Sequence, residues 1–260
     1  SLSVMIVHAE GGKALATTKP DAAVEVLGTI ADTGREALDE MRRIVGVLRN
    51  DPQDAATPDY APVPGLEDIP EMVARAALAG QQAFGENYLQ EAVEKMSQLG
   101  EAGLTNLEWH CIGPVQGNKT RLVAEHFDWL HTLDREKIAR RLAEQRPAGL
   151  APLQVCIQVN VDGGANKAGV APSEALALAR VVAALPGLQL RGVMSIPEPA
   201  PDFESQRALH LKARAVFEEI RAAGLPGAER FDTLSLGMSN DLEAAVAAGS
   251  TMVRVGSALF

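Results

Sequence analysis

The chain has 260 residues, 47% of them apolar, and a mean hydropathy near zero, so it can bury a full hydrophobic core. Its formal charge of −10 argues against a nucleic-acid partner, because binding a phosphate backbone needs a basic face. The longest apolar runs are too short to span a bilayer and the opening residues do not resemble a signal peptide, so we expect a cytoplasmic protein with no membrane partner. The cysteines, Cys111 and Cys156, both lie in apolar strand-like runs and are expected to be reduced. No spacing of Cys, His and carboxylate residues predicts a metal site.

Residues 20–49 predict one long helix. Apolar positions recur in steps of three and four from Leu27 to Leu48, which is the heptad-like seam of a helix that pairs with another helix. Pro20 suits the first helical position, and Asn50 to Pro52 ends the helix. We therefore expect a helical segment over residues 1–50 that can form a homodimer through the 20–49 helix. Residues 51–66 are rich in proline and read as a linker.

The opening segment also carries a resemblance. Residues 1–50, above all SLSVM at the start and EMRRIVGVLR at the end, resemble the dimerisation and phosphoacceptor helices of bacterial two-component sensor histidine kinases. In that family the phosphorylated histidine precedes the SLSV segment, and His8 does not match it. The resemblance therefore implies no kinase activity. It leaves open an alternative function, a dimerisation module that carries the rest of the chain as a passenger.

From residue 67 onward the pattern alternates between strands and helices. Each expected helix is long enough for a right-handed crossover between parallel strands. The pattern predicts a parallel α/β fold over residues 67–260, a (β/α)8 TIM-type barrel whose first strand is missing or replaced. The strands are expected near residues 82–84, 107–112, 128–132, 153–159, 190–195, 233–236 and 252–255. The helices are expected at 67–79, 88–99, 119–126, 134–145, 173–185, 203–223 and 240–248, with Asp134, Ser173 and Asn240 as N-caps.

The last two strands predict a phosphate site. A turn at Gly237, Met238 and Ser239 follows the 233–236 strand, and Gly256 and Ser257 follow the 252–255 strand, which carries Arg254. In barrels of this class the loops after strands 7 and 8 commonly hold phosphate. Two neighbouring loops that favour the same ligand are a stronger signal than any single residue.

Polar residues at the other strand ends are less specific. His110 suits either a satisfied core histidine or a site residue. Asn118 and Lys119 suit a helix cap as well as a ligand contact, and Lys167 reads as a loop cation.

A second resemblance covers residues 76–260. The segments FGENY, GPVQGNK and GMSNDLEAAVAAGSTMVRVG occur in the order and spacing of the pyridoxal-phosphate homeostasis proteins, single-domain relatives of the alanine racemase barrel. The resemblance implies a barrel that holds pyridoxal 5′-phosphate without an established turnover of substrate. Carried over by motif, the phosphate is held by Ser239, Arg254, Gly256 and Ser257, at the turn of Gly237 and Met238. The ring is expected near Asn87, His110 and Met194.

One departure from that family bears on function. Family members bind the cofactor as a Schiff base to a lysine at the end of the first strand, about twenty residues before FGENY. Here that place is taken by GLEDIPEMVARA, which contains no lysine. Residues Ala14–Pro20 (ALATTKP) are only a chance likeness, with Thr17 at the lysine's position. Ser3–Ala9 (SVMIVHA) is apolar enough to fill the strand's slot. We expect weak, non-covalent retention of the cofactor, and neither racemase nor decarboxylase activity.

Overall fold

A computed structural model describes residues 69–163 and 168–256 of the chain. The chain divides into two units, Ser1–Pro62 and Val63–Phe260, and every described residue belongs to the second unit. The predicted helix at 20–49, the linker at 51–66 and the segment Ser3–Ala9 lie outside the described residues.

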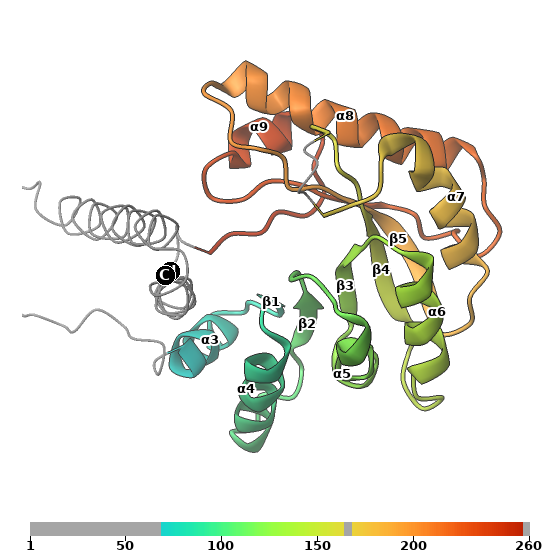
Figure 1. Cartoon of the computed structure of the whole chain (residues 1–260). Coiled ribbons are helices and arrows are strands. Elements are labelled where there is room, and N and C mark those ends of the chain that lie inside the picture. Colours follow the sequence, from blue (N-terminus) through green and yellow to red (C-terminus); the bar gives the residue numbers. More distant parts are fainter. Residues whose placement is uncertain (1–68, 164–167, 257–260) are drawn as a thin grey trace, which may run out of the picture. The chain divides into compact units, whose positions relative to one another are not determined.

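Six strands form one curled sheet in chain order (Figure 1). Every neighbouring pair is parallel, so each connection must cross over the sheet through a helix. The predicted fold class, a parallel α/β sheet of the barrel type, is therefore confirmed. The strands are β1 (Ala83–Glu86), β2 (Glu108–Cys111), β3 (Trp129–Leu133), β4 (Leu153–Gln158), β5 (Leu188–Met194) and β6 (Thr233–Ser235).

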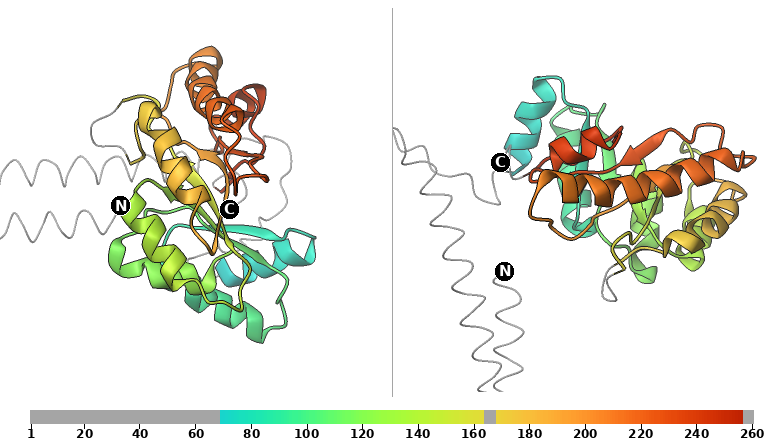
Figure 2. Two further views of the ribbon diagram at one scale, coloured as in Figure 1. Left: turned by 90° about the vertical axis from the view of Figure 1, so that its right-hand side faces the viewer. Right: turned by 90° about the horizontal axis from the view of Figure 1, so that it is seen from above.

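Helices cover the outer face of this sheet, as Figure 1 and the two further views of Figure 2 show. They bury an apolar layer against the strands, and each fully buried aliphatic side chain in it contributes about 1.5–3 kcal/mol. The largest buried side chains of this layer include Phe127, Leu130, Leu142, Leu153 and Ile220. The helices are α3 (Ile69–Leu78), α4 (Leu89–Glu101), α5 (Thr120–His126), α6 (Glu136–Gln145), α7 (Pro172–Ala183), α8 (Phe203–Ala222) and α9 (Leu242–Ala247).

The two faces of the sheet have different chemistry, because successive side chains along a strand alternate between them. Leu130 on β3 belongs to the large core under the helices, whereas its neighbour Trp129 belongs to a small second cluster with Cys156 and Met194. His131 follows Trp129 by two residues and is also fully buried. The inner face of the curl is therefore more polar than the outer one.

The three predicted N-caps are wrong. Arg135 occupies the N-cap of α6, and Asp134 instead accepts a hydrogen bond from that arginine. Pro172 begins α7, because its fixed φ suits the first helical position, so Ser173 lies inside the helix.

At α9 the N-cap residue is Asp241 rather than Asn240. The Asp241 carboxylate accepts the Met238 N–H at 2.7 Å, and this bond turns the chain one residue later than we predicted.

The expected strand at 252–255 is reduced to one parallel bridge between Ser235 and Met252. The Leu236 N–H donates to the Met252 carbonyl at 3.1 Å, and the Arg254 N–H donates to the Gly237 carbonyl at 3.0 Å. Gly237 has φ +90°, which turns the chain away after β6 and removes the partner that a longer ladder would need. Among the helices of the described ranges, none is long and apolar enough to cross a membrane.

Candidate functional site

A cavity of about 1200 Å³ opens at the carboxyl ends of the strands. One wall comes from β1 and Asn87, and another from the Met252–Gly256 segment that follows β6. His110 of β2 and His131 of β3 lie along it, and α3 contributes apolar side chains. In parallel α/β sheets this end of the strands is where ligands bind.

The structure brings most of the predicted site residues to this cavity. Met194 is fully buried in the inner cluster and Gly237 is buried in its turn; the cavity wall includes neither of them. Ser257 lies outside the described residues. The predicted residues that do line the cavity are Asn87, His110, Met238, Ser239, Arg254 and Gly256.

Only glycine fits at the first position of the turn after β6, which is Gly237. A Cβ added to Gly237 would lie 2.5 Å from the Cβ of Ala245 on α9, and the positive φ already disfavours any side chain there. The next residue, Met238, donates its N–H to Asp241, whose carboxylate also lies 2.9 Å from Nε2 of buried His210. Helix α8, which carries His210, therefore fixes the conformation of the turn that presents Ser239.

Arg254 places a cation at the inner wall of the cavity. Its Nη1 donates to the Ser235 carbonyl at 2.9 Å and to Ser235 Oγ at 2.6 Å, and its Nη2 donates to the Ser195 carbonyl at 3.1 Å. Burial lowers the pKa of the guanidinium to about 10, so it remains charged near neutral pH. The side chain is held in one orientation between the ends of β5 and β6.

Ser250 and Thr251 attach the Arg254 segment to β6, a role that the sequence did not suggest. Ser250 Oγ lies within 3.1 Å of the carbonyls of Leu234, Leu236 and Met252. Thr251 Oγ1 accepts the Leu234 N–H at 2.8 Å. These side-chain bonds replace the ladder of a regular strand and fix where the arginine emerges.

His110 is buried and hydrogen-bonded on both ring nitrogens. Its Nδ1 lies 2.9 Å from Nε2 of His131, and its Nε2 lies 2.9 Å from the Glu108 carboxylate. His131, which the sequence analysis missed, places its Nδ1 2.9 Å from Ser235 Oγ. Its spacing of two from Trp129 was the available signal, because residues i and i+2 of a strand share a face.

Burial shifts both imidazoles toward their neutral forms. Desolvation lowers the pKa of His110, although the nearby carboxylate of Glu108 opposes that shift. Desolvation lowers the pKa of His131 well below its ordinary value, and the positive charge of Arg254 adds to the effect.

The β1 wall is built from close loop packing. A Cβ on Gly113 would lie 2.2 Å from the Asn87 carbonyl oxygen, so the loops after β1 and β2 touch through their backbones. Lys95 of α4 forms an ion pair with Glu86 at the end of β1, and both side chains are largely buried. Of the lysines in the described ranges, Lys95 alone lines the cavity. Lys119 does not reach the cavity wall.

A fixed cation, a serine and a tight backbone turn on one wall suit a small anion such as a phosphate group. Within residues 69–163 and 168–256, no group of three or more His, Cys, Asp or Glu residues is placed to hold a metal ion.

Comparison with known proteins places this fold and site in a class. Residues 70–260 match the family model of the alanine racemase N-terminal domain, and residues 1–54 match a histidine kinase model. The pyridoxal phosphate homeostasis protein of Vibrio cholerae is 52% identical over 191 residues, which are 73% of this chain and 79% of that protein. That of Escherichia coli K12 is 52% identical over 188 residues, 72% of this chain and 79% of that protein.

Solved structures of related proteins support the same family assignment. PipY of Synechococcus elongatus, determined with pyridoxal phosphate bound, is 35% identical with a TM-score of 0.66, over 74% of this chain and 87% of that one. Alanine racemase of Corynebacterium glutamicum, 20% identical with a TM-score of 0.55 over 74% of this chain and 51% of that one, shares the fold. Fold and site thus define an alanine racemase-type barrel domain. The chain belongs to the pyridoxal phosphate homeostasis protein family, which confirms the predicted resemblance.

Proposed function

We propose that this chain binds pyridoxal 5′-phosphate non-covalently through its phosphate group, as a cofactor-homeostasis protein without turnover. The observation that carries the proposal is the cavity wall where Arg254, Ser239 and Gly256 meet. The cavity has a volume of about 1200 Å³, above the ~300–1000 Å³ of ordinary small-molecule sites. Pyridoxal phosphate is therefore small enough to enter it.

The residues divide between the two ends of the cofactor. Ser239, Arg254, Gly256 and Ser257 would hold the phosphate, with the turn of Gly237 and Met238 shaping that end. Asn87 and His110 would lie beside the ring, with Met194 beneath them. The bound group supplies an aldehyde and an electron-withdrawing ring; the protein supplies charge, orientation and shelter from water.

The state of the nearby lysine supports non-covalent retention. A covalent link to the cofactor's aldehyde requires a free, neutral amine. In the described part of the chain the cavity meets one lysine amine, that of Lys95, which is paired with the Glu86 carboxylate. An amine held in a buried ion pair is a poor nucleophile, because separating the pair leaves an unpaired charge.

The test compares ligands that differ only in the phosphate. The full chain is titrated with pyridoxal phosphate and with pyridoxal, following the fluorescence of the ligand. We expect pyridoxal to bind at least about tenfold more weakly, because it loses charge-assisted hydrogen bonds of ~1.5–3 kcal/mol. Inorganic phosphate should compete with pyridoxal phosphate. Equal affinity for the two compounds would refute the phosphate site.

Two further expectations belong to this proposal. We propose a cytoplasmic location, which suits the free, buried thiols of Cys111 and Cys156. Homodimer formation through residues 20–49 stays a prediction, since those residues lie outside the described ranges. Sedimentation of the full chain and of a Leu38→Glu variant tests it: a change from dimer to monomer is expected, and equal sedimentation would contradict it.

A further inference from the structure

We propose that Glu108, His110, His131 and Ser235 form a one-directional hydrogen-bond relay that positions Arg254. The proposal rests on the function above, because it assigns the relay to the same site. None of these four residues was predicted to hold the phosphate. Their role would be to fix the group that does.

The relay crosses three strands on the inner face of the sheet. Glu108 and His110 belong to β2, His131 to β3 and Ser235 to β6. The three distances between them are each 2.9 Å, and the final contact from Ser235 Oγ to Arg254 Nη1 is 2.6 Å. His131 and Ser235 are fully buried, so bulk water does not compete for the bond between them.

The two ends determine the direction of every bond between them. Arg254 can only donate, so Ser235 Oγ must accept from it; an ionised Glu108 can only accept, so His110 must donate from Nε2. A neutral imidazole has one donor and one acceptor, which leaves Nδ1 of His110 as an acceptor. His131 must therefore donate from Nε2 and accept at Nδ1. That acceptor takes the hydroxyl hydrogen of Ser235, so all four ring nitrogens of the two histidines have a hydrogen-bond partner.

The serine hydroxyl is where the relay acts on the arginine. With its hydrogen directed to His131, Ser235 turns its lone pairs toward the guanidinium. Without that acceptor the hydroxyl hydrogen can rotate toward Arg254, where it opposes the N–H donor. His131 is thus a positioning residue, because it acts on Arg254 through Ser235.

The relay also links two ends of the sheet. The Arg254 end lies on the wall of the large cavity, whereas Glu108 lines a separate pocket of about 410 Å³ with Gln82, Asn106 and Asp128. The Glu108 side chain is half exposed there. A change at Glu108 should therefore weaken cofactor binding although the large cavity does not include this residue.

The first test determines which ring nitrogen of each histidine carries a proton, and it needs no cofactor. Nitrogen-15 NMR of the full chain at pH 7.5 distinguishes the two neutral tautomers and the charged form of each histidine. Variants His110→Gln and His131→Gln assign the signals. We expect both histidines to carry their proton on Nε2. A proton on Nδ1 of His131, or a charged ring, would overturn the relay.

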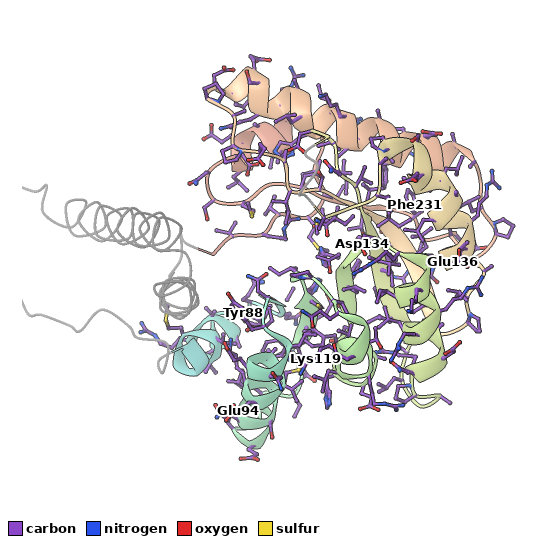
Figure 3. The ribbon with its side chains drawn as sticks, in the orientation of Figure 1. Tyr88, Glu94, Lys119, Asp134, Glu136 and Phe231 are labelled. Atoms are coloured by element: carbon purple, nitrogen blue, oxygen red, sulfur yellow. The ribbon has the colours of Figure 1, made fainter. Side chains whose placement is uncertain are left out.

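The second test connects the relay to binding. Glu108→Ala should weaken the affinity for pyridoxal phosphate about fivefold, the effect of one lost hydrogen bond. His131→Phe should do the same, and His131→Asn should restore part of the loss because its side chain can accept from Ser235. The matched control is Glu94→Gln on α4, an exposed carboxylate outside the relay (Figure 3). Affinities of Glu108→Ala and His131→Phe equal to that of the unaltered chain would overturn the positioning role.

The two tests separate failure of the relay from failure of the proposed function. Should the unaltered chain bind no pyridoxal phosphate while both tautomers are as expected, the function fails and the hydrogen-bond relay stands. Should the chain bind the cofactor with His131 in the other tautomer, the function stands and the relay fails. Glu108 is half exposed, so its alanine variant is expected to fold even where His131→Phe does not.

Discussion

The two flanks of the cavity are built in different ways. On the β6 flank, Ser250, Thr251 and Arg254 hydrogen-bond to a strand less than 25 residues away, and Arg254 also donates to the Ser195 carbonyl after β5. On the β1 flank, a strand of four residues has one parallel neighbour, β2, within the described part of the chain. Its residues Ala83 and Gly85 are exposed.

This difference shows which flank of the site is held by more contacts within the described residues. The wall proposed for the phosphate is held by bonds to β6, to the Ser195 carbonyl after β5 and to His210 of α8, none of which involves β1. The β1 flank is a strand edge, and such edges take up further strands readily. We therefore expect larger effects from changes in the proposed phosphate wall than from changes in its supports.

The largest effect is expected at Arg254. Arg254→Leu removes the fixed cation, and truncating one partner of a buried charged contact costs ~2–5 kcal/mol, so the affinity for pyridoxal phosphate should fall about 30-fold or more. Arg254→Lys should recover part of it, because lysine keeps the charge but not the planar fork. Ligand fluorescence titration measures both. Arg121→Ala, on the exposed face of α5, is the control, and a loss there of similar size would contradict the account.

A second prediction concerns the turn after β6. Gly237→Ala should lower the free energy of unfolding by about 2–5 kcal/mol, combining a positive φ (~1–2 kcal/mol) with a Cβ forced against Ala245 (~1–3 kcal/mol). Gly100→Ala, in α4 with open space around its Cβ, should instead stabilise by about 0.5–1 kcal/mol. Urea unfolding of both variants measures the contrast. Similar free energies of unfolding for the two variants would show that the backbone of the turn does not require glycine.

The smallest effect is a pH dependence from the inner face. Burial lowers the folded-state pKa of His110 and His131, so their neutral forms are favoured when the chain is folded. The unfolded chain then binds more protons below its histidine pKa of about 6.5, and stability is present above that pH and is lost as the pH falls below it. The titratable groups that act on these rings are Glu108 and Asp128, which face His110, and His110 and Arg254, which face His131.

Urea unfolding at pH 8 and pH 5.5 checks this sign, and the His131→Phe variant should lose part of the dependence. Stability that rises as the pH falls would contradict the assignment of neutral histidines.

The sequence predicted the architecture because alternation of strands and helices depends on local pattern alone. The sequence also predicted that Asn87, His110, Ser239 and Arg254 belong to one site, because the ends of parallel strands meet at one edge of a sheet. His131 escaped notice because it lies in the run Trp129–Leu133, which is buried on both faces. Only the curl of the sheet decides which of those residues reach the cavity.

Helix starts and edge strands were harder to predict for a related reason. Asp241 rather than Asn240 is the N-cap of α9, and its carboxylate bonds both the nearby Met238 N–H and, across the fold, His210 of α8. The 252–255 strand shortens to a bridge because Ser250 and Arg254 take over the bonds of the ladder. The bond of Asp241 to His210 and the bonds of Ser250 to β6 cannot be read from local propensity, since each joins segments brought together by the fold.

Reductive trapping tests the central claim most directly. The full chain is saturated with pyridoxal phosphate, reduced with borohydride and digested, and every lysine is examined by mass spectrometry. We predict cofactor bound at equilibrium that dialyses away, with no lysine modified stoichiometrically before or after reduction. A stoichiometric pyridoxyl adduct on a single lysine would contradict the account, with Lys95 and, outside the described ranges, Lys13 and Lys19 as the positions to inspect, together with Lys119.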